Sequence, residues 1–330
     1  MPALKTGVCM FEKENIQSDR IRQSLYSLLG RDLVNSILEK KVEELMLNPD
    51  GKMFVKCSHG HLEQVGCVDT YRASAIIRSI ASLNSREIPN NSPVIDCEID
   101  FLKVRFAAVL PPLVKAPVFC LRSFNTLTIS IDELLSEGFI NEHLYEVLKK
   151  LILSKKNLLI CGQTACGKTT FLNSLLRLVL CNDAQSRIIT IEDTPELEIN
   201  GKNCVSLYTS KNADMSYLVK ASLRLSPDRI VVGEIRSKEA LDMLDALSTG
   251  HDGAMCSMHA GNEIQALERL KLLISRNPNA PSGIERLIGT SIDAIVVLKK
   301  APYRHVHCIY QVNGFEDKKY KLELLGENLI

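Results

Sequence analysis

The residues of this sequence best suited to chemistry form a loop, Gly162-Gln-Thr-Ala-Cys-Gly-Lys168-Thr169, between an apolar run and a helical pattern. In a G-x-x-x-x-G-K-[ST] loop the backbone N–H groups point into one concavity, and the following helix adds partial positive charge. Lys168 is expected to contact the β- and γ-phosphates, and the Thr169 hydroxyl to bind Mg²⁺. The sequence therefore predicts a site for a nucleoside triphosphate and Mg²⁺ formed by Gly162, Gln163, Thr164, Ala165, Cys166, Gly167, Lys168, Thr169 and Thr170.

Acidic residues follow two other strand-like runs. The run Ile230-Val-Val-Gly233 ends at Glu234, and Gly233 occupies the place of the aspartate that usually supports Mg²⁺. We therefore interpret Glu234 as the residue that orients or deprotonates water, and not as a primary metal ligand. The missing acid could come from the neighbouring strand-like run, which is followed by Glu192, Asp193 and Glu196.

Histidines form a third group of candidates. His251 and His259 flank a short strand-like run, where either a sensor role or a purely structural role is open. Arg236, close after Glu234, is equally open. Two clusters could hold a metal because alternating residues share a strand face, although ordinary turn or strand residues are the preferred interpretation. They are Cys57-x-His59-x-His61 and the group His305, His307 and Cys308.

The sequence pattern of the second half of the chain predicts the strands and helices that position these residues. Apolar strand-like runs alternate there with helical patterns of 10–15 residues, which predicts a doubly wound parallel α/β sheet. Strands are expected at 157–161, 187–191, 229–232, 254–259, 292–298 and within 304–325, and helices at 168–180, 215–225, 238–247 and 263–274.

The first half predicts a smaller α+β domain. Helices are expected over 18–41 and 70–83, two short strands around the turn Asn48-Pro49-Asp50-Gly51, and extended segments over 93–121. The polar stretch 123–130 is the best linker candidate. We therefore expect an N-terminal domain over 1–122, a linker over 123–130, and a P-loop domain over 131–330.

Composition excludes several classes of protein. The chain has 330 residues, 45% of them hydrophobic, with 40 Lys and Arg against 39 Asp and Glu. It is therefore not intrinsically disordered, and a net charge of +1 does not favour duplex DNA as the main partner. There is no apolar run long enough for a membrane helix and no signal-peptide pattern. Eleven cysteines without a C-x-x-C pair also fit a soluble, cytoplasmic chain.

The ordered motifs GxxxxGKT, IEDTPEL, PDRIVVGEIR and TGHDGAMCSMHAG resemble those of the type II/IV secretion (traffic) ATPase superfamily. Further segments are similar to TrbB-like P-type conjugative transfer ATPases. They are EELMLNPDGKMFV, the pair Arg105-Phe106 before LPP, VKAPVFCLR ending in Arg122, and Tyr320-Lys-Leu, so that the resemblance covers about residues 28–325.

The resemblance implies a homohexameric ring with a RecA-like C-terminal domain that hydrolyses ATP. Such a ring works at the cytoplasmic face of the inner membrane with membrane components of a type IV secretion machine, without direct sequence-specific nucleic-acid binding. It powers channel or pilus assembly, or substrate translocation. Carried over by motif, the catalytic set is Glu234 as the Walker B acid, Glu192 and Glu196 of the acidic box, His251 and His259 of the histidine box, Lys168, and the N-terminal arginines Arg105 and Arg122.

This sequence departs from the family pattern at two places. Ala165-Cys166 replaces the usual Gly-Ser of the phosphate-binding loop, and Ser226 replaces a basic residue. Because Cys166 lies at a helix N-terminus, which favours thiolate, we expect it to be accessible and reactive, and Cys161 in the strand to be inert.

Other functions remain in competition with this one. A RecA-like nucleic-acid-dependent ATPase would share the core but need a basic path for nucleic acid. A type IV pilus or type II secretion motor would share all four motifs. A GTPase would need N-K-x-D and D-x-x-G sequences, and neither occurs after Gly162.

Overall fold

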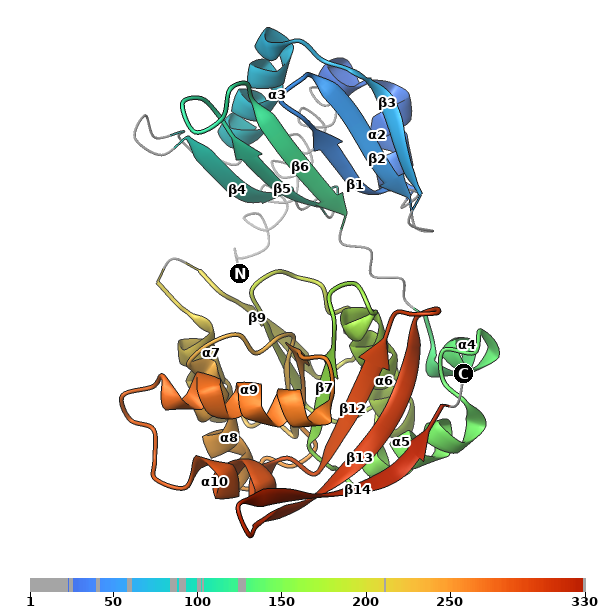
Figure 1. Ribbon diagram of the computed structural model, residues 1–330, viewed down its shortest axis with the longest axis vertical. Helices are drawn as coiled ribbons and strands as arrows, with labels where there is room; N and C mark the ends of the chain where they lie inside the picture. Colours follow the sequence, from blue (N-terminus) through green and yellow to red (C-terminus); the bar gives the residue numbers. More distant parts are fainter. Residues whose placement is uncertain are drawn as a thin grey trace, which may run out of the picture. The chain divides into compact units, whose positions relative to one another are not determined.

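The computed structural model describes residues 23, 26–39, 42–57, 61–83, 88, 93–99, 102, 104–123, 129–210 and 212–328. The chain divides into two compact units, Met1–Asn125 and Thr126–Ile330 (Figure 1). The point of division falls within the predicted linker, 123–130. No helix in the described ranges is long and apolar enough to cross a membrane.

The N-terminal unit is built on a six-stranded antiparallel sheet in the order β3-β2-β1-β6-β5-β4. Helices α2 and α3 cover one face, where Ile37, Ile76 and Ile80 pack against strand residues such as Leu45 and Phe106. The elements are β1 (Val42–Leu47), β2 (Lys52–Cys57), β3 (Leu62–Cys67), β4 (Val94–Ile99), β5 (Val104–Val109), β6 (Val118–Ser123), α2 (Arg31–Leu38) and α3 (Thr70–Leu83).

Local sequence signals account for much of this unit. The helix predicted over 70–83 and the turn after β1 are present, and Gly51 has a φ of 82° that favours glycine. The helix predicted over 18–41 lies partly outside the described residues. Its described part is interrupted at Gly30, whose φ of 93° ends the helical residues 26–29 before α2 begins.

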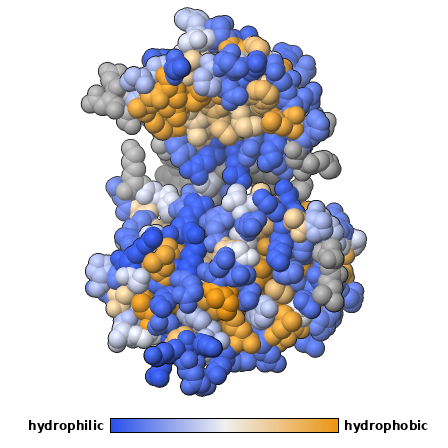
Figure 2. Space-filling view, in the orientation of Figure 1, coloured by the Kyte–Doolittle hydropathy of each residue, from blue (hydrophilic) through white to orange (hydrophobic). Residues whose placement is uncertain are grey.

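The other face of this sheet carries the alternate strand residues. Arg105 on β5 and Arg122 on β6 are direct cross-strand partners on this face. At the opposite ends of the strands, Val94, Val109 and Val118 lie in register. Figure 2 shows an apolar area over these strands with a hydrophilic band beside it.

The C-terminal unit contains an eight-stranded sheet in the order β14-β13-β12-β7-β11-β10-β8-β9. Strands β12, β7, β11, β10, β8 and β9 are parallel, whereas β13 and β14 add an antiparallel edge. The strands are β7 (Leu158–Gly162), β8 (Ile188–Glu192), β9 (Cys204–Tyr208), β10 (Arg229–Val232), β11 (Met255–His259), β12 (Ala294–Lys299), β13 (His305–Glu316) and β14 (Lys319–Glu327).

Helices cover both faces of this sheet, which confirms the predicted doubly wound α/β fold. One apolar cluster joins α4, α5 and α6 to the sheet, and another joins α7 to α10 to the opposite face. The sequence did not predict β9 or α10 as separate elements. The helices are α4 (Ile131–Ser136), α5 (Glu142–Leu153), α6 (Lys168–Asn182), α7 (Met215–Ser222), α8 (Glu239–Ser248), α9 (Glu263–Ser275) and α10 (Ile284–Ser291).

Candidate nucleotide-binding site

The predicted phosphate-binding loop connects β7 to α6. A Cβ atom at Gly162 would lie 2.5 Å from Cys166 Sγ and 2.8 Å from the carbonyl oxygen of Leu298, so that only glycine fits there. Gly167 caps α6 in the left-handed region with a φ of 94°. Ala165 is also left-handed, with a φ of 63°, at one of the two positions where the sequence departs from the family loop. Left-handed residues of this kind are typical of loops whose backbone N–H groups face one concavity and bind an anion.

Lys168 and Thr169 are engaged at the start of α6. The Lys168 ammonium donates to the carbonyl oxygens of Gly162 and Gln163, each at 3.2 Å, and lies 3.0 Å from His259 Nδ1. The Thr169 hydroxyl donates to Glu196 Oε2 at 2.9 Å. A hydroxyl paired with a carboxylate is an oxygen donor set of the kind that Mg²⁺ prefers, so these residues fit the predicted ion.

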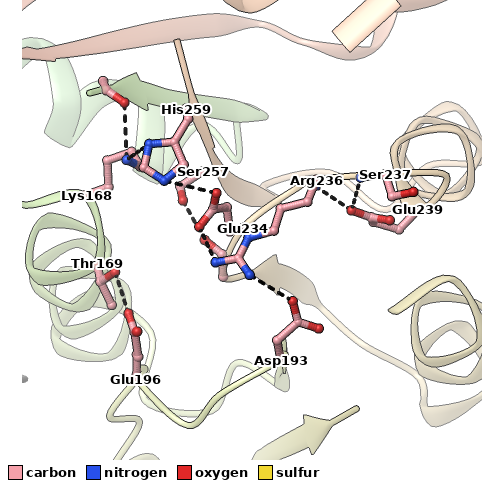
Figure 3. Close-up of polar contacts among 12 residues, drawn as sticks. Lys168, Thr169, Asp193, Glu196, Glu234, Arg236, Ser237, Glu239, Ser257 and His259 are labelled. Atoms are coloured by element: carbon pink, nitrogen blue, oxygen red, sulfur yellow. Dashed lines mark hydrogen bonds and ion pairs between the residues drawn. The ribbon is translucent and has the colours of Figure 1, made fainter. Parts of the chain in front are cut away.

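Glu234 has a donor on each carboxylate oxygen. Its Oε1 lies 3.2 Å from His259 Nε2, and its Oε2 accepts from Arg236 Nη2 at 2.8 Å (Figure 3). Arg236 also contacts Asp193 Oδ2 at 3.3 Å. Since His259 Nδ1 faces the Lys168 ammonium, His259 is best placed with its proton on Nε2. A continuous chain of polar contacts thus joins Lys168, His259, Glu234, Arg236 and Asp193.

The backbone around Glu234 is held by two residues that the sequence gave no reason to select. Ser257 Oγ donates to the Gly233 carbonyl oxygen at 2.6 Å, and Ile235 N donates to the Ser257 carbonyl oxygen at 2.8 Å. Glu239 is buried, and its Oε1 accepts from the backbone N–H groups of Arg236 and Ser237. The only sequence signals were a serine two residues before His259 and an acidic residue at the start of α8.

The acidic residues at the end of β8 and in the loop after it have different contacts. Glu192 is only 3% exposed, and its Oε1 accepts from the backbone N–H groups of Glu196 and Leu197 at 3.0 and 2.8 Å. Glu192 therefore holds the loop, while Glu196 contacts Thr169. Gly233 allows the close approach, since a Cβ atom there would lie 3.1 Å from Glu192 Cγ.

The other predicted site residues lie elsewhere. His251 precedes β11 and lies beside the end of α8, with Nδ1 at 3.2 Å from the Ala246 carbonyl oxygen. His259 is the last residue of this five-residue strand, so the two histidines lie at opposite ends of β11. In the N-terminal unit, Arg105 makes two hydrogen bonds to Asp96, at 2.9 and 2.6 Å, and Arg122 lies 3.7 Å from Glu44.

The pKa values of the central groups reflect burial and neighbouring charge. Burial lowers the pKa of Lys168 and that of His259, which the Lys168 charge lowers further. Burial alone would raise the pKa of Glu234, but Arg236, His259 and Lys168 together hold it below its ordinary value. Glu234 is therefore ionised at neutral pH, as a base must be.

The remaining candidates are Cys166 and the two clusters of possible metal ligands. The expectation of a reactive Cys166 is wrong for this structure, because the side chain is fully buried and burial raises its pKa despite the nearby Lys168. Within the described residues, no three His, Cys, Asp or Glu side chains are grouped to hold a metal ion, and His305 is buried within β13. His59 of the other cluster lies outside the described residues.

Known proteins resemble this chain along most of its length. Residues 19–314 match the family model described as "Type II/IV secretion system protein". The chain is 34% identical over 306 residues to the probable conjugal transfer protein TrbB of Sinorhizobium fredii, covering 92% of this chain and 93% of the relative. It is 32% identical over 306 residues to the conjugal transfer protein TrbB of Rhizobium radiobacter, covering 92% and 94%.

Solved structures share the fold. The pilus retraction motor PilT with bound ADP is 18% identical and has a TM-score of 0.61, covering 90% of this chain and 83% of the other. The ATPase DotB of Legionella pneumophila is 20% identical with a TM-score of 0.58, covering 85% and 75%. The chain belongs to the Type II/IV secretion system protein family, and within it to the TrbB-like conjugal transfer proteins. It is an ATPase of that family, as the motifs predicted.

Proposed function

We propose that this ATPase forms a homohexameric ring that powers conjugal transfer through a type IV secretion machine at the cytoplasmic face of the inner membrane. The observation that carries the proposal is similarity to two conjugal transfer proteins along nearly the whole length of both chains. Membrane components of the machine would be its partners, and ATP hydrolysis would drive channel or pilus assembly, or substrate translocation.

The polar chain supports a specific route for hydrolysis. When ATP binds, Lys168 leaves the carbonyl oxygens of Gly162 and Gln163 and contacts the β- and γ-phosphates. Glu234 accepts the proton of the attacking water, which requires one of its two oxygens to be released by His259 or Arg236. A Mg²⁺ ion held through Thr169, with Glu196 beside it, would neutralise phosphate charge.

His259 connects these two changes in the proposed mechanism. In this structure it lies between the Lys168 ammonium and the Glu234 carboxylate. When Lys168 moves to the phosphates, His259 loses one of its two contacts. The position of His259 would then depend on whether a γ-phosphate is present, and this change could be passed to the rest of the ring. A similar part for His251 stays a prediction, because His251 lies beyond the other end of β11.

Arg105 and Arg122 are proposed to complete the site from the N-terminal unit. The two residues are direct cross-strand partners on one face of the sheet. Each would have to leave its carboxylate partner, Asp96 or Glu44, to contact a phosphate. Loss of either cation would leave charge on the transferred phosphoryl group with one fewer partner. We expect Arg105→Ala and Arg122→Ala each to slow ATP hydrolysis by about tenfold or more. Unchanged turnover in both variants would exclude this part of the proposal.

A mating assay tests the function directly. The chromosomal or plasmid copy of this gene is replaced by the wild type, by Lys168→Ala, or by Lys202→Ala as an exposed control. Donors with Lys168→Ala are expected to lose transfer, whereas Lys202→Ala retains it. Light scattering of the purified protein with and without an ATP analogue then measures the ring. Normal transfer with Lys168→Ala, or a protein that stays monomeric with nucleotide, would contradict the proposal.

A further inference from the structure

A buried charged cluster joins helix α7 to helix α8. Asp242 of α8 is buried, and its carboxylate accepts a hydrogen bond from the Ser216 hydroxyl of α7 and lies 3.0 Å from the Lys220 ammonium of the same helix. Ser216 is also buried, whereas the Lys220 side chain reaches solvent. These three residues take no part in the proposed hydrolysis, yet they place a carboxylate inside the core.

A second ion pair joins the same two helices where they begin. The Lys238 ammonium, directly before α8, lies 2.7 Å from Oδ2 of Asp214, directly before α7. Asp214 also caps α7, because its Oδ1 accepts from the Tyr217 N–H at 2.9 Å. Lys238 and Asp242 are four residues apart, so the two contacts lie about one turn apart along α8. Helix α8 is therefore attached to α7 at two points near its N-terminus.

Apolar side chains form another part of the contact between α7 and α8. Leu218 and Val219 of α7 belong to the same buried cluster as Leu241 and Leu244 of α8. Apolar contacts are non-directional, so they would tolerate a small slide or rotation of α8 on α7. A buried carboxylate does not tolerate it, because the loss of its partners leaves a charge uncompensated in the core. Asp242 therefore fixes a single position of α8 on α7.

The position of α8 in turn determines that of Arg236. Glu239, in the first turn of α8, is buried and accepts from the backbone N–H groups of Arg236 and Ser237 at 2.5 and 2.7 Å (Figure 3). The Arg236 guanidinium donates to Glu234 Oε2 at 2.8 Å. A shift of α8 would therefore move the Arg236 backbone and weaken its contact with the Glu234 carboxylate.

We propose that Asp242 is a positioning residue for ATP hydrolysis, which holds α8 on α7 through Ser216 and Lys220 and so keeps Arg236 in contact with Glu234. The proposal rests on the proposed role of Glu234 as the base. A displaced guanidinium leaves Glu234 without one of the contacts that orient it, and a misplaced catalytic group reacts more slowly. The phosphate-binding loop lies between β7 and α6, so ATP binding does not depend on this cluster.

Steady-state kinetics of full-length variants test the proposal. Asp242→Ala removes both contacts, and kcat is expected to fall about tenfold with KM for ATP retained. Asp242→Asn can still accept from Lys220 and donate to the Ser216 hydroxyl, so most of kcat is expected to return. The matched control is Asp245→Ala, at an exposed position of the same helix, which keeps kcat. Wild-type kcat in Asp242→Ala would overturn the proposal, as would Asp242→Asn no faster than Asp242→Ala.

A second control separates positioning from loss of stability. Ile309→Val shortens a buried side chain of β13, in the apolar cluster on the opposite face of the sheet. It is expected to lower the free energy of unfolding with kcat unchanged. If Ile309→Val lowers kcat as much as Asp242→Ala does, the effect belongs to stability and the positioning role is wrong.

The pH dependence of kcat tests whether Asp242 acts through Arg236. Glu234 is faced by Arg236, by His259 of β11 and by Lys168 of α6, which together oppose the rise that burial causes in its pKa. Asp242→Ala is expected to raise the pKa of Glu234 and to move the acidic limb of kcat to higher pH.

The double variant makes this test specific. In the Arg236→Gln background, Asp242→Ala is expected to move the acidic limb no further, because the two changes act through one contact. A further shift in the double variant, or an unmoved limb in Asp242→Ala alone, would overturn the positioning role. Full turnover in Glu234→Gln would instead overturn the proposed base, which distinguishes the two failures.

Discussion

Ser257 holds the peptide groups on both sides of Glu234. Its hydroxyl donates to the carbonyl oxygen of Gly233 at 2.6 Å, and its own carbonyl oxygen accepts from Ile235 N at 2.8 Å. Two residues further along the same strand, His259 contacts the Glu234 carboxylate. Strand β11 therefore fixes the proposed catalytic base through its backbone and its side chain together, which links the orientation of Glu234 to the strand beside the phosphate-binding loop.

Replacement of Ser257 by alanine tests this support. The variant loses one hydrogen bond and is expected to lose about 1 kcal/mol in free energy of unfolding. Because a displaced catalytic group reacts more slowly, kcat is expected to fall by about one to two orders of magnitude with KM for ATP retained. The control is Ser291→Ala, since the buried Ser291 hydroxyl has no hydrogen-bond partner among the described residues. Equal kcat values for the two variants would show that Ser257 does not position Glu234.

Glu234→Gln separates binding from hydrolysis. The amide keeps the shape of the side chain but cannot accept the proton of water, so we expect ATP binding to persist and turnover to be lost. Isothermal titration with ATP and a phosphate-release assay measure the two effects. Lys168→Ala is the complementary variant, which loses the cation for the phosphates and hence turnover, with its circular dichroism spectrum unchanged. Loss of ATP binding in Glu234→Gln would assign Glu234 to the metal or to folding instead.

Arg236→Gln is expected to change the pH dependence of hydrolysis. Burial raises the pKa of Glu234, and Arg236 is the strongest of the groups that oppose burial, with His259 from β11 and Lys168 from α6 as the others. Without the guanidinium the pKa of Glu234 rises. Because the carboxylate is the active form, activity is then lost at a higher pH as the solution is acidified.

The measurement is kcat against pH between pH 5 and pH 8, a range in which the wild type is expected to show no loss due to Glu234. Arg236→Lys restores a cation and is expected to return the acidic limb toward the wild-type position. Arg276→Gln, at an exposed position after α9, serves as the control. Coincident acidic limbs for Arg236→Gln and the wild type would show that Arg236 does not set the protonation of Glu234.

Ala165→Gly addresses the backbone of the phosphate-binding loop. Ala165 has a φ of 63°, a conformation that costs an L-residue with a Cβ about 1–2 kcal/mol. Glycine removes that cost but adds freedom to the unfolded chain, which offsets about 0.4–1 kcal/mol of the gain. We expect a net stabilisation of about 0.5–1 kcal/mol in a urea titration. The matched control is Ala301→Gly, in an exposed loop. If Ala165→Gly lowers the free energy of unfolding by as much as Ala301→Gly does, the backbone at Ala165 is not strained.

Local chemistry was enough to predict the phosphate-binding loop and many of the elements around it. Glycine dihedral angles, a turn sequence such as Asn48–Gly51, and the helical spacing over 70–83 depend on neighbouring residues, so they are legible in the sequence. The alternation of strands and helices likewise predicted the doubly wound sheet. The helix over 18–41 was less predictable. The helical spacing of apolar residues continues on both sides of Gly30, although the helix itself is interrupted there.

The tertiary structure alone decided which of the charged residues meet. Contacts between Lys168, His259 and Glu234 depend on the strand order β7-β11-β10, which residue spacing does not specify. The same order places Ser257 beside Glu234 and leaves His251 beyond the opposite end of β11. Cys166 shows most directly where prediction from local sequence fails. Its position at a helix N-terminus is a local property that favours thiolate, whereas its burial comes from packing between distant segments and has the larger effect on its pKa.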